Sequence, residues 1–354
     1  MGWSRNIGMG IGMAVTLAGV LALGGCSDGD AGAARRQPPM PSGGAAQLEG
    51  QYEKVVGAVL PSVVKIETDQ GEGSGVVFDG DGHVVTNAHV VAGAKKVQVT
   101  AASGGAPLKA TQVGSFAADD LAVVKVAGGT LRPAAFGDSA KIEVGRIVLA
   151  MGNPLGLAGS VTNGIVSALN RTVSTKQEGD FPGSTIADAV QTSAAINPGN
   201  SGGALVGLDG QVIGIPTAAA SDPQMGGAAV GIGFATPSNT VKRIVPQLIR
   251  DGRVTDSGRA AIGATVRTIV DPSGGEGGGG VAVVEVAPGG GAATAGIRPG
   301  DVILSANGTP TPDQTALSAV LAALKPGGTV KLEIQRPDGS KQTLDVTLGE
   351  LPAD

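Results

Sequence analysis

The segment Asn197-Pro198-Gly199-Asn200-Ser201-Gly202-Gly203 places one hydroxyl among residues that favour tight turns. Gly, Asn and Pro supply the backbone conformations of a sharp turn, so successive backbone N–H groups can point into one small space beside Ser201. This is the outline of an oxyanion hole, with the N–H groups of Gly199 and Ser201 as its donors. Because a serine hydroxyl is a weak nucleophile at neutral pH, the interpretation requires a histidine as general base and an acid that orients it.

The chain has two histidines, His83 and His89, and His89 is the candidate base. It lies in Val84-Val85-Thr86-Asn87-Ala88-His89-Val90-Val91, whereas His83 is predicted to be an ordinary strand residue. The candidate acids are the carboxylates of Ala118-Asp119-Asp120-Leu121-Ala122-Val123-Val124-Lys125, at the start of an apolar strand. From the residues alone, Asp119 and Asp120 are nearly equal candidates. The order His, Asp, Ser is one of several in which catalytic triads occur.

These three segments resemble the HtrA (DegP-like) family of trypsin-fold serine proteases. Two further segments share the resemblance, Gly152-Asn153-Pro154-Leu155-Gly156 and Gly231-Ile232-Gly233-Phe234-Ala235-Thr236-Pro237-Ser238-Asn239. Five motifs in the family's order are far more specific than a single short motif. The resemblance extends from about Val55 to the C-terminus. It favours Asp120 as the acid, because the acid of the family directly precedes the Leu-Ala-Val strand.

The resemblance implies a mainly β fold, with two six-stranded, chymotrypsin-like β-barrels followed by a small α+β PDZ domain. Short apolar strands separated by Gly-rich turns are typical of closed or sandwiched β-sheets. The strands expected in the first barrel are 62–68, 75–78, 83–86, 96–100, 108–113, 121–126 and 146–151. Those expected in the second are 161–169, 189–192, 204–206, 211–215 and 229–235. The active site would lie in the cleft between the barrels, with Ser201 from the second and the other two residues from the first.

The resemblance also places a pocket for the residue on the acyl side of the cut. Ile213, Gly214 and Ile215 are expected to wall it, and apolar walls favour small or medium aliphatic side chains. Two residues depart from the family pattern. Ser193 stands where relatives often carry an acid, which predicts a looser activation loop. Pro216 lies in the pocket strand and removes a backbone donor, so its position on the sheet should be unpaired.

A closing helix is expected from Pro237 to Asp251. Ser238 is the candidate N-cap, Gly252 follows the last turn, and Pro246 is expected to kink or divide the helix. Residues 49–251 then form the protease domain, and the polar residues 252–259 form a linker.

From Ala260 the pattern changes, and residues 260–350 resemble a PDZ domain, with Ala295-Gly296-Ile297-Arg298-Pro299-Gly300-Asp301 as the most specific match. Thr311-Pro312-Asp313-Gln314 is predicted to be a capping box with proline at the first helical position. The apolar residues that follow recur at helical spacing, which predicts one buried face. They are Leu317, Val320, Leu321 and Leu324.

A PDZ domain binds an extended peptide by strand addition. The turn Ile262-Gly263-Ala264 is expected to offer N–H groups to the peptide's terminal carboxylate, although Ile262 could equally be a core residue. The Gly-rich insertion from Asp271 to Gly280 is expected to be a mobile loop.

Residues 1–25 have the features of a secretory signal peptide: a basic start, an apolar run and small residues before a cleavage point. Leu23-Gly24-Gly25-Cys26 resembles a bacterial lipobox, so Cys26 is the expected site of lipid attachment; the alternative is an uncleaved transmembrane helix. Residues 26–48 are expected to form a flexible tether. These features predict a protein exported from the cytoplasm and anchored to the cell membrane.

The composition excludes several classes of protein. The chain is 42% hydrophobic but 2% aromatic, so its core must consist of aliphatic residues. A net charge of −5 without a basic cluster argues against nucleic-acid binding. The single cysteine allows no intramolecular disulfide. The sequence shows no cluster typical of a metal site, and it implies no cofactor.

The leading hypothesis is a serine endopeptidase of the cell envelope that cleaves unfolded or misfolded polypeptides, with a PDZ domain that binds C-terminal peptides. One alternative is a chaperone-like holdase whose protease site is dormant, and another is a scaffold in which the PDZ domain alone matters. Family members often form homotrimers through the N-terminal part of the protease domain, where Tyr52 and Val55 are the candidate contacts.

Overall fold

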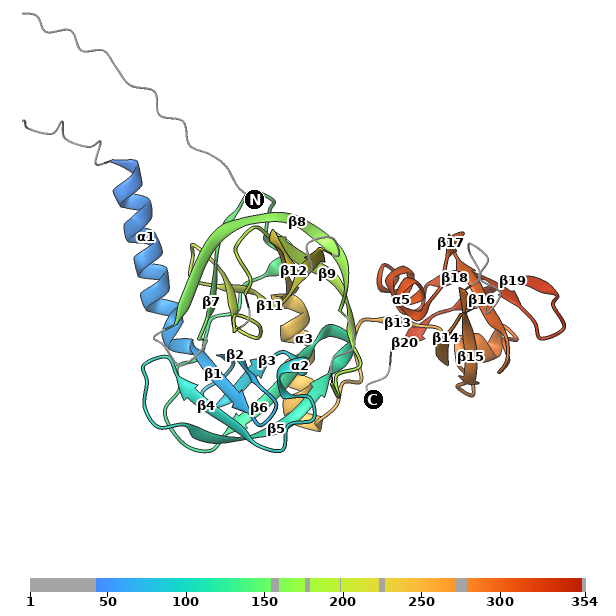
Figure 1. Cartoon of the computed structure of the whole chain (residues 1–354), viewed down its shortest axis with the longest axis horizontal. Coiled ribbons are helices and arrows are strands. Elements are labelled where there is room, and N and C mark those ends of the chain that lie inside the picture. Colours follow the sequence, from blue (N-terminus) through green and yellow to red (C-terminus); the bar gives the residue numbers. More distant parts are fainter. Residues whose placement is uncertain are drawn as a thin grey trace, which may run out of the picture. The chain divides into compact units, whose positions relative to one another are not determined.

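The computed structural model of the chain describes residues 43–153, 159–175, 179–197, 199–222, 227–270 and 279–351 (Figure 1). The compact unit Ala45–Asp354 contains nearly all described residues. The predicted signal peptide, Cys26 and most of the predicted tether lie outside the described residues, as does most of the Gly-rich insertion at 271–280. Among the helices of the described residues, none is long and apolar enough to cross a membrane.

The first barrel is closed and antiparallel, with strand order β1-β2-β3-β6-β5-β4. Its strands are β1 (Val63–Thr68), β2 (Glu72–Val77), β3 (His83–Thr86), β4 (Val97–Ala101), β5 (Leu108–Phe116) and β6 (Leu121–Val126). Strands β2 and β3 form an antiparallel hairpin, in which Val76 pairs with Val85. A Cβ at Gly75 would lie 2.5 Å from the Val84 side chain, so a strand glycine is required where the barrel wall closes tightly.

The second barrel is also closed, with order β10-β11-β12-β9-β8-β7. Its strands are β7 (Ile147–Gly152), β8 (Ser160–Thr175), β9 (Ser184–Thr192), β10 (Ala204–Gly207), β11 (Val212–Asp222) and β12 (Gly227–Pro237). The predicted pair of six-stranded barrels is therefore confirmed. The strand at 146–151 belongs to the second barrel, where it pairs with β10, and not to the first.

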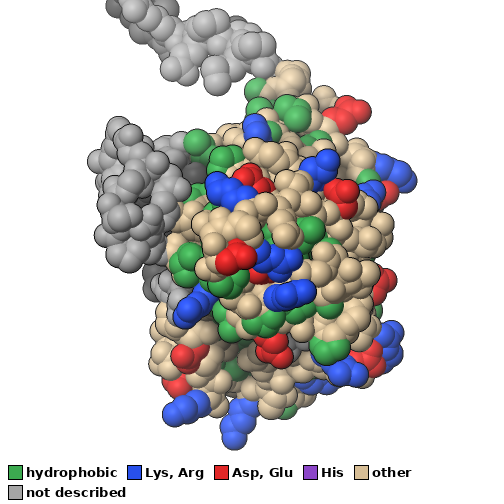
Figure 2. All heavy atoms as spheres, turned by 90° about the vertical axis from the view of Figure 1, so that its right-hand side faces the viewer, with side chains coloured by type: hydrophobic (Ala, Val, Ile, Leu, Met, Phe, Trp, Pro, Cys, Tyr) green, Lys and Arg blue, Asp and Glu red, His purple; other side chains and the backbone are tan. Residues whose placement is uncertain are grey.

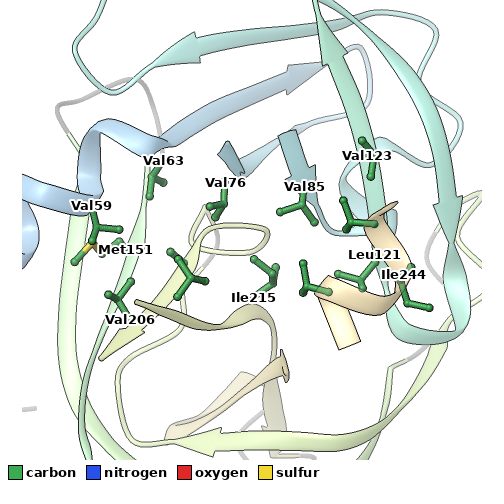
Figure 3. Packing of buried hydrophobic residues seen from close by; sticks show 14 of the residues in the cluster. Val59, Val63, Val76, Val85, Leu121, Val123, Met151, Val206, Ile215 and Ile244 are labelled. Atoms are coloured by element: carbon green, nitrogen blue, oxygen red, sulfur yellow. The ribbon is translucent and has the colours of Figure 1, made fainter. Parts of the chain in front are cut away.

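One aliphatic core joins the two barrels to the helices α1 (Gly44–Val59) and α3 (Ser238–Asp251), as Figure 3 shows. Val63 and Val85 come from the first barrel, Met151 and Ile215 from the second, and Ile244 from α3. Separate clusters fill each barrel's own interior. Because the shared core holds the barrels together, a site assembled from both depends on this packing.

Helix α1 begins at Gly44, inside the segment predicted as tether. It buries Val55 and Val59, and Tyr52 packs half-buried against the shared core. A 3-10 turn at Leu60–Ser62 leads into β1. The helix therefore ties the start of the folded domain to both barrels.

The closing helix α3 corrects one expectation. Ser238 is its first residue and not its N-cap, which is Pro237; the Ser238 hydroxyl donates to the carbonyl of Gly137 at 3.0 Å. Pro246 lies inside a helix that stays undivided. Gly252 adopts the left-handed conformation at φ 69° and its N–H donates to Leu248, as expected of a C-terminal glycine.

The C-terminal module has a sheet of order β14-β15-β16-β18-β19 and two short helices. Its elements are β13 (Ala260–Ala261), β14 (Ala264–Val270), β15 (Gly279–Val286), α4 (Gly291–Thr294), β16 (Val302–Ala306), β17 (Thr309–Pro310), α5 (Gln314–Ala322), β18 (Thr329–Gln335), β19 (Lys341–Thr347) and β20 (Gly349–Glu350). The capping-box prediction is wrong by two residues: Asp313 is the N-cap and accepts from the N–H of Ala316, while Thr311 donates to a strand carbonyl.

On the face drawn in Figure 2, basic and acidic side chains alternate between small apolar patches. Lys341 and Glu333 of the C-terminal module form an ion pair, with their charged atoms 3.9 Å apart. Charges interspersed in this way do not make a single-sign field on this face.

Candidate active site

His89 and Asp120 meet in the first barrel through two hydrogen bonds. The Nδ1 atom of His89 lies 2.7 Å from Oδ2 of Asp120, and the backbone N–H of His89 donates to Oδ1 at 3.0 Å. His89 lies in the short helix α2 (Ala88–Val91), and its side chain is 27% exposed, whereas that of Asp120 is fully buried. The Nδ1 side of the imidazole therefore contacts the buried carboxylate, and part of the ring is exposed to solvent.

The backbone at Asp120 explains how its carboxylate reaches His89. Asp120 follows the 3-10 turn Ala117–Asp119 and adopts the left-handed conformation, with φ 52° and ψ 46°. Its N–H donates to Ala117 at 3.0 Å, and its carbonyl accepts from the Asn87 amide at 2.9 Å. A left-handed aspartate costs free energy and is held by such surrounding bonds. The turn aims this side chain toward α2.

The neighbouring Asp119 carboxylate has a different partner. It forms a buried ion pair with Arg259, whose Nη1 lies 2.5 Å from Oδ1. Burial raises the pKa of Asp119, against the opposing charge and hydrogen bond of Arg259. The other oxygen of Asp119 is buried without a hydrogen-bond partner among the residues that the structure describes. The contact with His89 thus belongs to Asp120, the choice that the residues alone left open.

Thr217 supplies a third hydrogen bond to Asp120, which sequence analysis did not foresee. Its hydroxyl donates to Oδ2, and the residue, on β11 of the second barrel, is 4% exposed. A carboxylate that accepts from a hydroxyl and a backbone N–H acts as an acceptor toward the imidazole as well. The geometry therefore places the ring proton of His89 on Nδ1 and makes Nε2 the acceptor.

Phe181 is a second residue that sequence analysis missed. Its ring packs edge-to-face on His89, with centroids 5.8 Å apart and planes inclined by 62°. Phe181 is 2% exposed and belongs to the core of the first barrel, although it lies between β8 and β9 of the second. Nothing local in its sequence points to the site, because the contact arises from the long-range fold.

The turn that carries Ser201 is bonded to both barrels. The carbonyl of Ser201 accepts from the N–H of Ser74 on β2 at 2.9 Å, and the N–H of Gly202 donates to Pro216 on β11 at 2.9 Å. A Cβ at Gly202 would lie 2.2 Å from the Ser74 carbonyl oxygen, and one at Gly203 would lie 2.2 Å from the Met151 carbonyl oxygen. The two glycines are therefore required by close backbone packing.

Gly199, the predicted oxyanion donor beside Ser201, has φ 98°, a conformation that favours glycine. The N–H of Asn200 donates to Asn197 at 3.0 Å, which closes the tight turn predicted from the sequence. Pro198 lies outside the described residues.

The expected specificity pocket needs correction. The side chains of Ile213 and Ile215 are 1% and 0% exposed, and they belong to the core of the second barrel and to the shared core, respectively. They cannot wall an open pocket, so any contact with a substrate would use their backbone. A Cβ at Gly214 would lie 2.9 Å from the carbonyl oxygen of Thr236, so this glycine serves the packing of β11 on β12.

The two departures from the family pattern have structural explanations. The register between β11 and β12 shifts directly after Pro216. Proline has no backbone N–H to donate to the neighbouring strand, and such irregular positions are where a sheet accepts proline. Ser193, expected to loosen its loop, is bonded twice to Ile165 of β8: its N–H donates at 3.1 Å and its hydroxyl accepts at 3.0 Å.

The predicted peptide turn of the C-terminal module lies between β13 and β14. Ile262 is 3% exposed within the module's core, which favours the structural interpretation of its side chain. Gly263 has φ 73° and its carbonyl accepts from Ala287 at 2.9 Å. Ala264 begins β14, an edge strand of the sheet and therefore a position where strand addition is possible.

Among the described residues, one group could offer three ligands to a metal: Asp79, Asp81 and His83, with ligand atoms within 4.8 Å. His83 is a residue of β3, as predicted, and its Nδ1 lies 2.6 Å from Asp79. The Asp79 carboxylate also accepts from the N–H groups of Asp81 and His83. These hydrogen bonds lie within the turn that joins β2 to β3, so the structure of the turn explains why the three side chains lie close together.

Comparisons with known proteins agree with this architecture. Residues 73–215 match the trypsin-like peptidase domain, and residues 260–348 match the PDZ domain. The serine protease PepD of Mycobacterium tuberculosis is 40% identical, over 94% of this chain and 78% of that protein. A probable periplasmic serine endoprotease, DegP-like, of Pseudomonas putida is 39% identical over 80% of this chain, which spans 57% of that relative's length.

Solved structures show the same similarity. The HtrA-type protease AlgW with a decapeptide has a TM-score of 0.55 and 32% identity, over 85% of this chain and 99% of that one. The serine endoprotease from Yersinia pestis has a TM-score of 0.54 and 33% identity, over 85% and 98%. These relatives are proteases, which does not favour a dormant-site holdase. The chain belongs to the HtrA family of trypsin-like serine proteases and is a serine endopeptidase with one C-terminal PDZ domain.

Proposed function

We propose that Ser201, His89 and Asp120 form the catalytic triad and that the N–H groups of Gly199 and Ser201 form the oxyanion hole. The single observation that carries the proposal is the pair of hydrogen bonds that the Asp120 carboxylate accepts from His89, at 2.7 Å from the ring and 3.0 Å from the backbone N–H. Together with the bond from Thr217, they orient the imidazole in the tautomer that a general base needs.

In this mechanism, Nε2 of His89 takes the proton of the Ser201 hydroxyl as its oxygen attacks the scissile carbonyl. The two backbone N–H groups stabilise the negative oxygen of the tetrahedral intermediate. The protonated His89 then gives its proton to the leaving amine, while the Asp120 carboxylate stabilises the imidazolium. Water attacks the acyl-enzyme with His89 again as base, and Ser201 is regenerated.

We propose unfolded or misfolded polypeptides as substrates and C-terminal peptides as ligands of the PDZ domain. The DegP-like relatives are named endoproteases, and AlgW was solved with a decapeptide. In this chain, the edge strand β14 supports peptide binding by strand addition, with the backbone at Ile262, Gly263 and Ala264 as the carboxylate site.

We further propose that the protein is exported, anchored to the cell membrane through lipid on Cys26, and assembled as a homotrimer through its N-terminal part. The signal-like sequence before Cys26 and the relatives named periplasmic support export. Several acyl chains, each CH₂ worth about 0.8 kcal/mol, would hold the protein firmly on a membrane. Globomycin-sensitive processing and the mass of the N-terminal peptide would test the anchor, and sedimentation would test the trimer.

The triad is tested by labelling with a serine-directed fluorophosphonate and by casein hydrolysis. The wild-type chain should react in both assays, and Ser201→Ala in neither. Asp120→Asn should reduce kcat by about 10³- to 10⁴-fold, because the imidazole loses the correct tautomer. Asp119→Asn is the comparison, since it changes the adjacent carboxylate that does not contact His89. It also breaks the buried ion pair with Arg259, so we expect it to lose stability and some activity, but far less kcat than Asp120→Asn. Equal losses in the two asparagine variants would contradict the assignment.

A further inference from the structure

Ser74 is a fully buried serine of β2 at the centre of four hydrogen bonds. Its N–H donates to the carbonyl of Ser201 at 2.9 Å, and its hydroxyl donates to the carbonyl of Gly199 at 2.5 Å. The same hydroxyl accepts from the N–H of Asn153 at 2.8 Å, and the Ser74 carbonyl accepts from the hydroxyl of Thr86 at 2.7 Å. One residue of the first barrel thus binds the carbonyl of the proposed nucleophile and that of Gly199, two residues before it.

The direction of these bonds follows from the chemistry of a hydroxyl. A serine hydroxyl has one proton to donate and can accept through its lone pairs. The N–H of Asn153 can only donate and the carbonyl of Gly199 can only accept, so the hydroxyl proton must point to Gly199. Asn153 directly follows β7 of the second barrel, so the hydroxyl connects three segments that are distant in the sequence.

The two carbonyls that Ser74 binds belong to the two residues whose N–H groups form the proposed oxyanion hole. Two planar peptide units meet at each Cα atom: one contains the residue's own N–H and the other contains its carbonyl. Holding the carbonyl fixes the second unit, which limits the backbone rotations that would turn the N–H of the same residue out of position. Gly199, at φ 98°, has the wide conformational freedom of glycine and gains most from an external bond. The Ser74 hydroxyl is the side-chain group bonded to its carbonyl.

We propose that Ser74 is a positioning residue for the oxyanion hole, acting through the carbonyl of Gly199. The inference rests on the proposed role of Ser201 and extends it to a residue that touches neither substrate nor the reacting hydroxyl. The alternative is that the hydroxyl only satisfies buried backbone groups and contributes to stability. An aligned oxyanion hole lowers the barrier to reaction and has little effect on ground-state binding.

The test compares Ser74→Ala with Ser238→Ala in the full-length chain. Ser238 is the matched control: it is also fully buried, and its hydroxyl also donates to a backbone carbonyl, that of Gly137. For Ser74→Ala we expect kcat and the rate of fluorophosphonate labelling to fall by about 10- to 100-fold, below the loss for removing an oxyanion donor itself. KM for a short peptide should change by less than about 2-fold, and Ser238→Ala should retain the wild-type labelling rate.

The outcomes separate this inference from the proposed triad. If the wild-type chain does not label, the triad fails first and the role of Ser74 fails with it. If the wild type labels and folded Ser74→Ala labels at the same rate, or if KM alone rises, the positioning role is overturned while the triad stands. If Ser74→Ala does not fold, Ser74→Cys replaces it in the test. The thiol is of similar size to the hydroxyl but is a weak hydrogen-bond donor. Slow labelling of this variant supports the proposal, and labelling at the wild-type rate overturns it.

Discussion

The guanidinium of Arg259, the last residue of the predicted linker, lies 2.5 Å from the carboxylate of Asp119, the residue that precedes the proposed catalytic Asp120. Both side chains are buried, and the Arg259 guanidinium also donates to the carbonyl of Ala118 at 3.3 Å. The carbonyl of Arg259 in turn accepts from the N–H of Leu351 at 2.7 Å. The linker is thus bonded to the turn that aims Asp120 at His89.

Arg259→Ala should therefore reduce both stability and activity. Removing one partner of a buried ion pair leaves an uncompensated charge and costs about 3 to 5 kcal/mol. We expect a loss of this size in the free energy of unfolding by urea, together with slower fluorophosphonate labelling, because the turn before Asp120 loses its support.

Arg336→Ala is the control for this prediction. Arg336 forms a comparable ion pair with the buried Asp301, at 2.6 Å, within the C-terminal module. It should destabilise that module and leave labelling of Ser201 unchanged. Equal labelling rates for the Arg259 and Arg336 variants would show that the linker contact does not support the active site.

Gly203→Ala should abolish activity through packing alone. The added Cβ would lie 2.2 Å from the carbonyl oxygen of Met151, a backbone atom of β7 that cannot move aside cheaply. We expect a loss of stability of at least about 1 to 3 kcal/mol and no labelling by fluorophosphonate.

Gly57→Ala provides the opposite case, because a Cβ at this position of α1 meets no atom within 4 Å. The substitution should stabilise the helix by up to about 1 kcal/mol. Thermal unfolding of the two variants should therefore shift in opposite directions.

Phe181→Leu should slow the enzyme more than it destabilises it. Leucine retains most of the buried apolar volume, but it removes the edge-to-face contact with His89, which is worth about 0.5 to 1.5 kcal/mol in such pairs. If the contact holds the imidazole in its reactive orientation, losing this energy should lower kcat by roughly 2- to 10-fold. Phe136→Leu, which breaks the ring contact with Phe78, is the control for stability. An unchanged kcat in Phe181→Leu would assign the ring to packing only.

The environment of Asp138 should make the stability of the fold depend on acid pH. The hydrogen bond from the Asn239 amide, at 2.7 Å, and that from the N–H of Ala140 lower the pKa of Asp138 below its usual value of 3.8. A carboxylate with a depressed folded-state pKa stabilises the fold above its unfolded pKa, and this contribution is lost as the pH falls through the folded value. Asp138→Asn should therefore lower Tm at pH 6 to 7, and its deficit should shrink below about pH 4. A deficit that is independent of pH would contradict this.

Much of this protein could be predicted from its sequence because its motifs have strict local requirements. The turn around Ser201, the histidine in Thr86–Val91 and the alternation of Val and Ile in the strands each limit the backbone strongly. These patterns predict short strands in closed or sandwiched sheets and an acid near His89. The two barrels and the PDZ module are predicted through the resemblance to the HtrA family that the motifs carry.

The remaining features depend on contacts between distant residues. Asp120 has a left-handed backbone conformation, which directs its carboxylate toward His89. Two adjacent aspartates in the sequence do not show which of them adopts it. Ser238 and Thr311 have the side chains of helix caps, but their hydroxyls bond to carbonyls of neighbouring segments instead. Ile213 and Ile215 are as apolar as a specificity pocket requires, yet both are used to fill cores.

The position of Tyr52 on α1 has a spectroscopic consequence. The chain contains one tyrosine and one tryptophan, Trp3, which lies in the predicted signal peptide. After cleavage before Cys26, ultraviolet absorbance and intrinsic fluorescence near 300 nm would come mainly from a single phenol, half-buried where α1 meets the shared core. Its emission would report directly on the docking of that helix, without any introduced label.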